Sequence, residues 1–96
     1  MQKVMNIEVL YFADFKDIVG KDKEICNIEN NLKDLIDLLI DKYQPIKKLI
    51  WDEKINNFKS SIKLAINDKL IIQENLLKLP LSEGDRVAFL MPLSGG

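Results

Sequence analysis

One long amphipathic segment near the middle of the chain limits the possible folds most. Apolar side chains recur there at spacings of three and four residues, which is the period of one helix face. They are Leu32, Leu35, Ile36, Leu39, Ile40 and Tyr43. Asn30 or Asn31 suits the N-cap of this helix, and Pro45 predicts an end at or soon after Tyr43. The apolar face needs a partner surface, which the remaining segments must supply.

Alternating segments on both sides of the helix predict the strands of that surface. Residues 5–12 alternate so that Met5, Ile7, Val9 and Tyr11 share the core face, while Leu10 and Phe12 end the other face. Residues 24–28 suit a second strand that pairs with the first as a hairpin. Between them, residues 13–19 suit a short helix ended by Gly20.

Three further strands are predicted after the helix. Residues 62–67 and 70–72 form two of them, joined by a turn at Asn67-Asp68. A tight turn at 82–85 precedes the last strand, residues 86–91. Its alternation places Val87, Phe89 and Met91 inward and Arg86, Ala88 and Leu90 outward.

Residues 46–61 give the weakest pattern. Ile46, Leu49 and Ile50 suggest a second short helix, and Trp51 either caps the core or lies half exposed. This region is also the most basic part of the chain, and we interpret its lysines as a solvated face. Its detailed structure stays open at this point.

The order of these elements predicts an α+β fold of the ubiquitin-like β-grasp type. A mixed sheet would pack on one main helix, which also supplies the crossover that parallel first and last strands require. With 96 residues, the chain is predicted to be one domain, 1–96, with a flexible C-terminal Gly-Gly tail.

Composition excludes several classes of function. The formal net charge is -1 and no basic footprint dominates, so we expect no nucleic-acid partner. The apolar runs are too short to span a bilayer and no signal sequence is seen, so we expect a cytoplasmic protein without a membrane partner.

The sequence also offers few residues suited to catalysis or metal binding. The chain has no histidine, and Cys26 is its only cysteine, set in an apolar run that favours a buried, inert thiol. The carboxylates and lysines are scattered without a paired-carboxylate or phosphate-binding spacing. We therefore expect no metal site, no bound cofactor and no catalysis by this chain alone.

The tail is the strongest candidate for chemistry. Pro92, Leu93, Ser94, Gly95 and Gly96 follow the last strand directly. Two glycines without side chains can enter a narrow site, and a partner could activate a carboxylate on Gly96. An inert, disordered end is the competing interpretation, because small polar residues are common there.

Four blocks of sequence carry a resemblance that bears on this choice. They are residues 9–13 (VLYFA), 65–67 (AIN), 81–89 (LSEGDRVAF) and 92–96 (PLSGG). Together they resemble the sulfur carrier family that contains the small subunit of molybdopterin synthase. The chain departs from that family at Met91, usually a proline, at Leu93, more often valine, and in residues 45–61, which are longer than usual.

The resemblance implies a defined role for Gly96. An adenylating enzyme similar to ubiquitin-activating enzymes would use ATP to form an acyl-adenylate on Gly96, and a persulfide sulfur would replace AMP to leave a thiocarboxylate. Sulfur would then pass to cyclic pyranopterin monophosphate within a complex with the molybdopterin synthase large subunit. Acid, base and phosphate-binding groups would come from these partners.

The same resemblance gives the outward apolar residues a role. Phe12, Leu70 and Leu90 would form a docking patch on the sheet face away from the helix, with Arg86 at its rim. Three other functions stay open: a thiamine-pathway sulfur carrier, a ubiquitin-like protein modifier, and an interaction module with an inert tail.

Overall fold

The computed structural model describes residues 4–72 and 75–90. Met91 and the predicted tail, 92–96, lie outside the described residues. The elements are β1 (Met5–Leu10), α1 (Ala13–Val19), β2 (Lys23–Ile28), α2 (Leu32–Lys42), α3 (Pro45–Ile50), β3 (Trp51–Asp52), β4 (Asn57–Phe58), β5 (Lys63–Ile66), β6 (Lys69–Ile71), the 3-10 helix η1 (Leu76–Lys78) and β7 (Arg86–Leu90).

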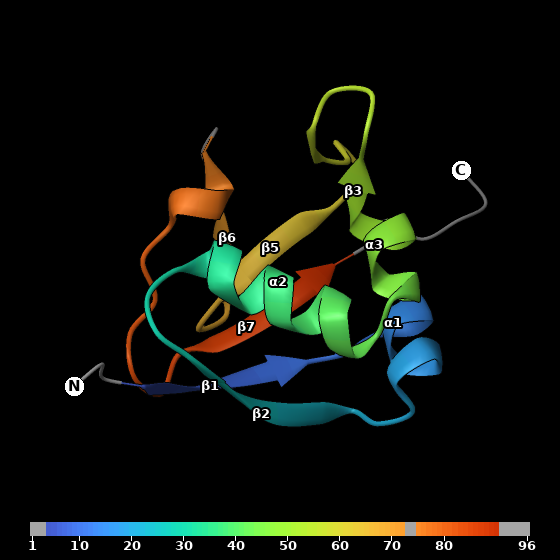
Figure 1. The fold of residues 1–96 in the computed structure, drawn as a ribbon. Coiled ribbons are helices and arrows are strands. Elements are labelled where there is room, and N and C mark those ends of the chain that lie inside the picture. The colour runs from blue at the N-terminus through green and yellow to red at the C-terminus, as the bar shows by residue number, and fades with distance from the viewer. Residues whose placement is uncertain (1–3, 73–74, 91–96) are drawn as a thin grey trace.

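The main sheet has the predicted mixed topology. Its five strands run in the order β2-β1-β7-β5-β6, so the first and last strands of the chain lie side by side. β1 and β7 are parallel, with Val9 opposite Val87, and every other pair in the sheet is antiparallel. Figure 1 shows α2 laid across one face of this sheet. The ubiquitin-like β-grasp prediction is confirmed.

The core lies between α2 and that face. Leu32, Leu35 and Leu39 of α2 are fully buried, as are Val9 and Val87 on the two central strands. Each such side chain contributes roughly 1.5–3 kcal/mol by leaving water. Phe15 of α1 closes one end of the core by stacking on Phe89, with 5.7 Å between ring centroids.

The predicted turns adopt backbone angles that suit their residues. Gly20 ends α1 with φ 82°, and Gly84 in the turn before β7 has φ 84°. Asn67 and Asp68 both have positive φ, as the two-residue turn between antiparallel β5 and β6 requires. The predicted turns at Gly20, Asn67-Asp68 and residues 82–85 are therefore confirmed.

Residues 45–61 contain more structure than their sequence indicates. The short helix is confirmed as α3, which begins at Pro45. A two-stranded hairpin that was not predicted follows it, pairing Trp51 with Phe58. Strands of two residues are too short to show alternation. The edge contact between the Trp51 and Phe58 rings, 5.7 Å between centroids, holds the hairpin together.

The N-terminus of α2 is fixed by a reciprocal pair of hydrogen bonds. The Asp34 amide donates to Asn31 Oδ1, and the Asn31 amide donates to Asp34 Oδ2, both at 3.2 Å. This capping box satisfies two backbone donors that the helix itself leaves unpaired. Asn31, and not Asn30, is therefore the N-cap.

We predict that Asn31→Ala lowers the free energy of unfolding by about 1 kcal/mol, because Asp34 loses its capping acceptor. Asn30→Ala, one residue earlier and exposed, is the matched control and leaves stability unchanged. Urea denaturation followed by circular dichroism measures both. Equal losses in the two variants would contradict the assignment of the cap.

Candidate functional site

The predicted reactive residue, Gly96, and the tail residues before it lie outside the described residues. The described part of the site begins with the strand that precedes them. That strand, β7, lies between β1 and β5 in the middle of the sheet. Val87 and Phe89 are buried beneath it, at 0% and 2% exposure. Its last residue, Leu90, lies opposite Lys63 of β5. The strand before the tail therefore has a hydrogen-bonded neighbour on each side and a buried inner face.

Strand register brings small and apolar side chains together on the face of the sheet away from α2. Leu70 lies opposite Ala65, Ala65 opposite Ala88, and Ala88 opposite Leu10. Because facing residues share a side of a sheet, these four form one row across four strands. We define the outer-face patch as this row with Leu90 and Phe12, that is, Leu10, Phe12, Ala65, Leu70, Ala88 and Leu90.

The exposure of the patch agrees with the prediction for its large side chains. Phe12 is 48% exposed, Leu70 is 53% exposed and Leu90 is partly exposed. Phe12 differs in one respect, since it follows β1 as the N-cap of α1 and is not part of the strand. Ala88 faces outward by register but is 7% exposed, because its methyl group lies low between larger neighbours on a central strand.

A shallow hollow of about 380 Å³ adjoins the patch where β1 meets α1. Leu10, Phe12 and Ala13 supply its apolar wall. Lys16 and Asp22 line its polar side, and their charged groups form an ion pair 2.7 Å apart. The hollow is large enough for one apolar side chain of a partner.

Arg86 lies at the edge of the same face, as predicted. Its Nε donates to Glu8 Oε1 at 2.9 Å, and its Nη1 lies 4.0 Å from Asp68 Oδ2. The side chain is half exposed, so it retains donors for a partner. Ile25, 57% exposed, was missed as a member of this face although it lies opposite Glu8. Its position between Glu24 and Cys26 in an alternating strand was the available signal.

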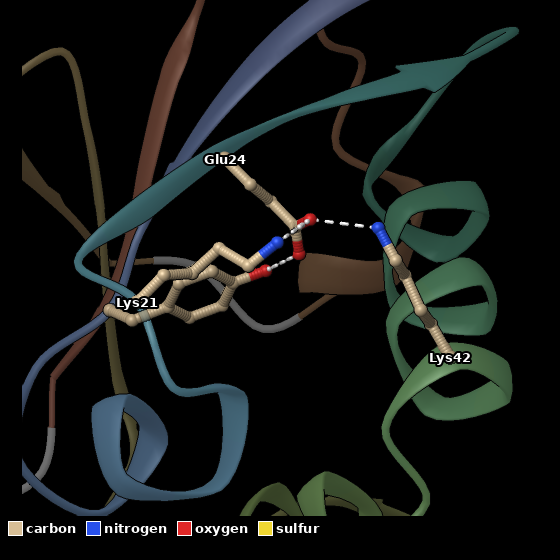
Figure 2. Close-up of polar contacts among 4 residues, drawn as sticks. Lys21, Glu24 and Lys42 are labelled. Atoms are coloured by element: carbon tan, nitrogen blue, oxygen red, sulfur yellow. Dashed lines mark hydrogen bonds and ion pairs between the residues drawn. The ribbon is translucent and has the colours of Figure 1, made fainter.

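The opposite face holds a polar cluster that sequence analysis did not identify. Glu24 extends from β2 toward α2, where Lys42 Nζ approaches one of its oxygens at 2.7 Å (Figure 2). Lys21 Nζ lies 3.3 Å from the same oxygen, and Tyr11 Oη donates to the other at 2.6 Å. The Glu24 side chain is only 9% exposed. The cluster thus joins the residue after β1, the turn before β2, β2 itself and the end of α2.

The ionisation of this cluster suits a structural role. Burial disfavours the Glu24 anion, but hydrogen bonds from Lys42 and Tyr11 outweigh it and lower the pKa to about 2. Burial and the Glu24 carboxylate raise the pKa of Tyr11 far above its usual range. Burial also raises the pKa of the Cys26 thiol to about 11. The pKa values of all three groups are thus displaced away from neutrality, which suits groups that belong to the folded framework.

Two further features are missing from the described part of the chain. Across residues 4–72 and 75–90, no three cysteine, aspartate or glutamate side chains gather as metal ligands. None of the helices described there is long and apolar enough to cross a membrane.

Known proteins resemble this chain over almost its whole length. The model of the ThiS family matches residues 9–96. The chain belongs to the ThiS family. Relatives from Drosophila ananassae and Drosophila erecta, each named molybdopterin synthase sulfur carrier subunit, are 29% identical over 96 residues, covering 97% of this chain and 93% of theirs.

Solved structures place this ThiS-family chain in the same fold. The solution structure of small archaeal modifier protein 1 from Methanosarcina acetivorans is 29% identical, with a TM-score of 0.79 over 98% of this chain and 99% of that one. The crystal structure of the Haloferax volcanii protein SAMP1 has a TM-score of 0.80 over 95% and 99% of the two chains. At 19% identity, the second likeness concerns the fold alone.

We predict that Lys42→Met lowers the free energy of unfolding by about 1 kcal/mol, because it removes a hydrogen bond to a nearly buried carboxylate. The expected loss is smaller than the full value of a charged hydrogen bond because the Lys42 side chain is 47% exposed. Lys33→Met is the matched control. It also lies on α2 and also holds a carboxylate at 2.7 Å, but both groups are 60% exposed. Its loss leaves stability nearly unchanged.

The effect of Lys42→Met also depends on pH. Since the native pKa of Glu24 is depressed from 4.5 to about 2, its contribution is present above pH 4.5 and is lost as pH falls toward 2. The difference between the wild type and Lys42→Met therefore shrinks over that range in urea titrations. A difference independent of pH would show that Glu24 is not the group through which Lys42 acts.

Proposed function

We propose that this chain is the sulfur carrier subunit of molybdopterin synthase and that Gly96 is its reactive residue. An adenylating enzyme similar to ubiquitin-activating enzymes joins the Gly96 carboxylate to the α-phosphorus of ATP and releases pyrophosphate. The terminal sulfur of a persulfide displaces AMP. A thiol then cleaves the sulfur–sulfur bond, becoming part of a disulfide, and leaves a thiocarboxylate on Gly96.

The sulfur of that thiocarboxylate is the group transferred. In the proposed reaction it attacks cyclic pyranopterin monophosphate held by the large synthase subunit, and hydrolysis later returns Gly96 to a carboxylate. ATP is used by the activating enzyme and is not bound by this chain. The chain thus carries the sulfur from the activating enzyme to the large synthase subunit.

The position of β7 is the observation that carries this proposal. It is a central strand with a fully buried Val87, and its last residue, Leu90, belongs to the outer-face patch. A partner bound to the patch would therefore hold the chain directly at the root of residues 91–96. The family match through residue 96 and the names of the Drosophila relatives support the same role.

The division of labour is consistent with the groups that the described chain offers. Glu24, Tyr11 and Cys26 have pKa values displaced away from neutrality and belong to the folded framework. A carrier requires only a reachable terminus and a recognition surface. The outer-face patch supplies apolar area for recognition, with Arg86 as a polar contact at its edge.

A protein modifier is the second candidate, because the archaeal protein that is 29% identical is named a small modifier protein. In that role the activated glycine would be attacked by a lysine amine of a target protein, and an isopeptide bond would form in place of a thiocarboxylate. Both roles share the adenylation step, so the nucleophile that follows it distinguishes them.

We predict that incubation with ATP, the adenylating enzyme and a persulfide donor exchanges one oxygen of Gly96 for sulfur. Intact-mass spectrometry measures the gain, fragmentation assigns it to Gly96, and a chain lacking Gly96 shows none. The absence of a gain with an enzyme that demonstrably adenylates the chain would refute the carrier role. Conjugates on target lysines in cell extract would then favour the modifier.

We also predict that Phe12→Asp and Leu70→Asp each weaken binding to the large synthase subunit by at least about tenfold, because a charge must be desolvated in an apolar contact. Ile55→Asp is the control, since Ile55 is at least as exposed, at 60%, but lies in the β3–β4 loop. Titration calorimetry on variants with native circular dichroism measures the effect. Equal affinity in all three variants would remove the patch from the interface.

A further inference from the structure

A second surface feature lies beside the end of the main helix. A groove of about 1100 Å³ runs between the end of α2, α3 and the β3–β4 hairpin. Ile40, Pro45 and Trp51 supply its apolar floor. Four lysines line it: Lys47, Lys48, Lys54 and Lys59. We call this feature the Trp51 groove.

The charge of this region is opposite to that of the rest of the chain. Residues 44–63 contain five lysines and two carboxylates, whereas the remaining residues contain nine cations and thirteen carboxylates. An acidic chain that concentrates its positive charge around one groove has a directional electrostatic field there. Simple solvation of the surface does not require such a separation.

Part of this positive charge is not neutralised within the described chain. Lys47 pairs with Glu53 at 3.4 Å, and the Asp52 carboxylate accepts the backbone amide of Lys54 at 2.9 Å. The ammonium groups of Lys48 and Lys54, both exposed, have no ion-pair partner in residues 4–72 and 75–90. Asp41 also lines the groove, at its α2 side. Asp52 and Glu53 of the hairpin line it as well, so within the described chain its exposed unpaired positive charge is that of Lys48 on α3 and Lys54 in the hairpin.

The floor of the groove is firmly held. Trp51 packs edge-on against the buried Phe58, and the Lys59 amide donates to the Ile50 carbonyl at 2.8 Å. Trp51 nevertheless stays partly exposed and lines the groove. A preorganised, partly exposed tryptophan is typical of the energetic centres of protein interfaces, and the lysines beside it would attract an acidic partner.

The groove and the outer-face patch use opposite sides of the sheet. Ile40 and the α3–β3 segment lie on the side covered by α2, as Figure 1 shows for α2 and α3. The patch, by register, lies on the other side. An occupant of the groove would therefore leave the patch free, so this inference does not depend on the proposed function.

We infer that the Trp51 groove binds an acidic segment of a partner protein through an apolar anchor. The anchor contacts Trp51 and Ile40, while carboxylates of the segment face Lys48 and Lys54. A protein segment fits better than a nucleic acid, because Trp51 is the single aromatic residue of the groove and offers no series of rings for successive bases.

Selection from a library of random twelve-residue peptides tests this inference. The whole chain is the bait, and peptides that also bind Lys48→Glu/Lys54→Glu are removed. Lys69→Glu/Lys78→Glu, which reverses two exposed lysines elsewhere, is the matched control. Selected peptides without tryptophan are then titrated while the emission of Trp51, the only tryptophan of the chain, is followed.

We expect the selected peptides to be acidic with an apolar residue, to change Trp51 emission saturably, and to bind Lys48→Glu/Lys54→Glu at least about tenfold more weakly than the control. Binding should weaken as salt increases. No enrichment, enrichment without acidic residues, or unchanged Trp51 emission would overturn the inference. Tighter binding of a twelve-residue oligothymidine than of any peptide would overturn it in favour of a nucleic acid.

Discussion

The parallel pairing of β1 with β7 is the contact on which the rest of the structure depends. Two strands from opposite ends of a chain can lie parallel only if the chain between them crosses over the sheet, and α2 makes that crossing. The crossing leaves α2 against one face and buries Val9 and Val87 beneath it. The other face receives no helix from this connection, so its side chains stay available to partners.

This arrangement also determines how the Gly-Gly segment is connected to the domain. β7 has a neighbour on each side and a buried inner face, so displacing it would disrupt the centre of the core. An edge strand such as β6 could yield to a partner at much lower cost. A tail that follows a central strand can be drawn into a deep site without unfolding its domain, which the proposed carrier role would require.

The parts of the fold that follow from local pattern could be predicted, and those that follow from tertiary contact could not. The stripe of α2, the turn at Asn67-Asp68 and the alternation of β1 and β7 each have a signal within a few residues. The Glu24 cluster has no such signal for two of its members. Lys21 lies three residues from Glu24, but Tyr11 and Lys42 meet Glu24 only after β2 pairs with β1 and packs on α2. The β3–β4 hairpin was missed for a related reason, because the Trp51–Phe58 ring contact stabilises it.

The candidate site divides in the same way. The outward positions of Leu70 and Leu90 follow from alternation within their strands. That they lie in one patch with Leu10 depends on the order of the strands, which places Ala65 and Ala88 between Leu10 and Leu70. The two alanines matter because their small side chains lie in the middle of the row and the larger leucines lie at its ends. A partner can therefore approach the sheet closely between the leucines. The surface available for recognition is thus a property of the sheet, whereas the proposed reactive group is a property of the sequence beyond it. The outer-face patch and the segment that leads to the proposed reactive group meet at Leu90. Because they are adjacent, the proposed carrier role is a better explanation than an inert module.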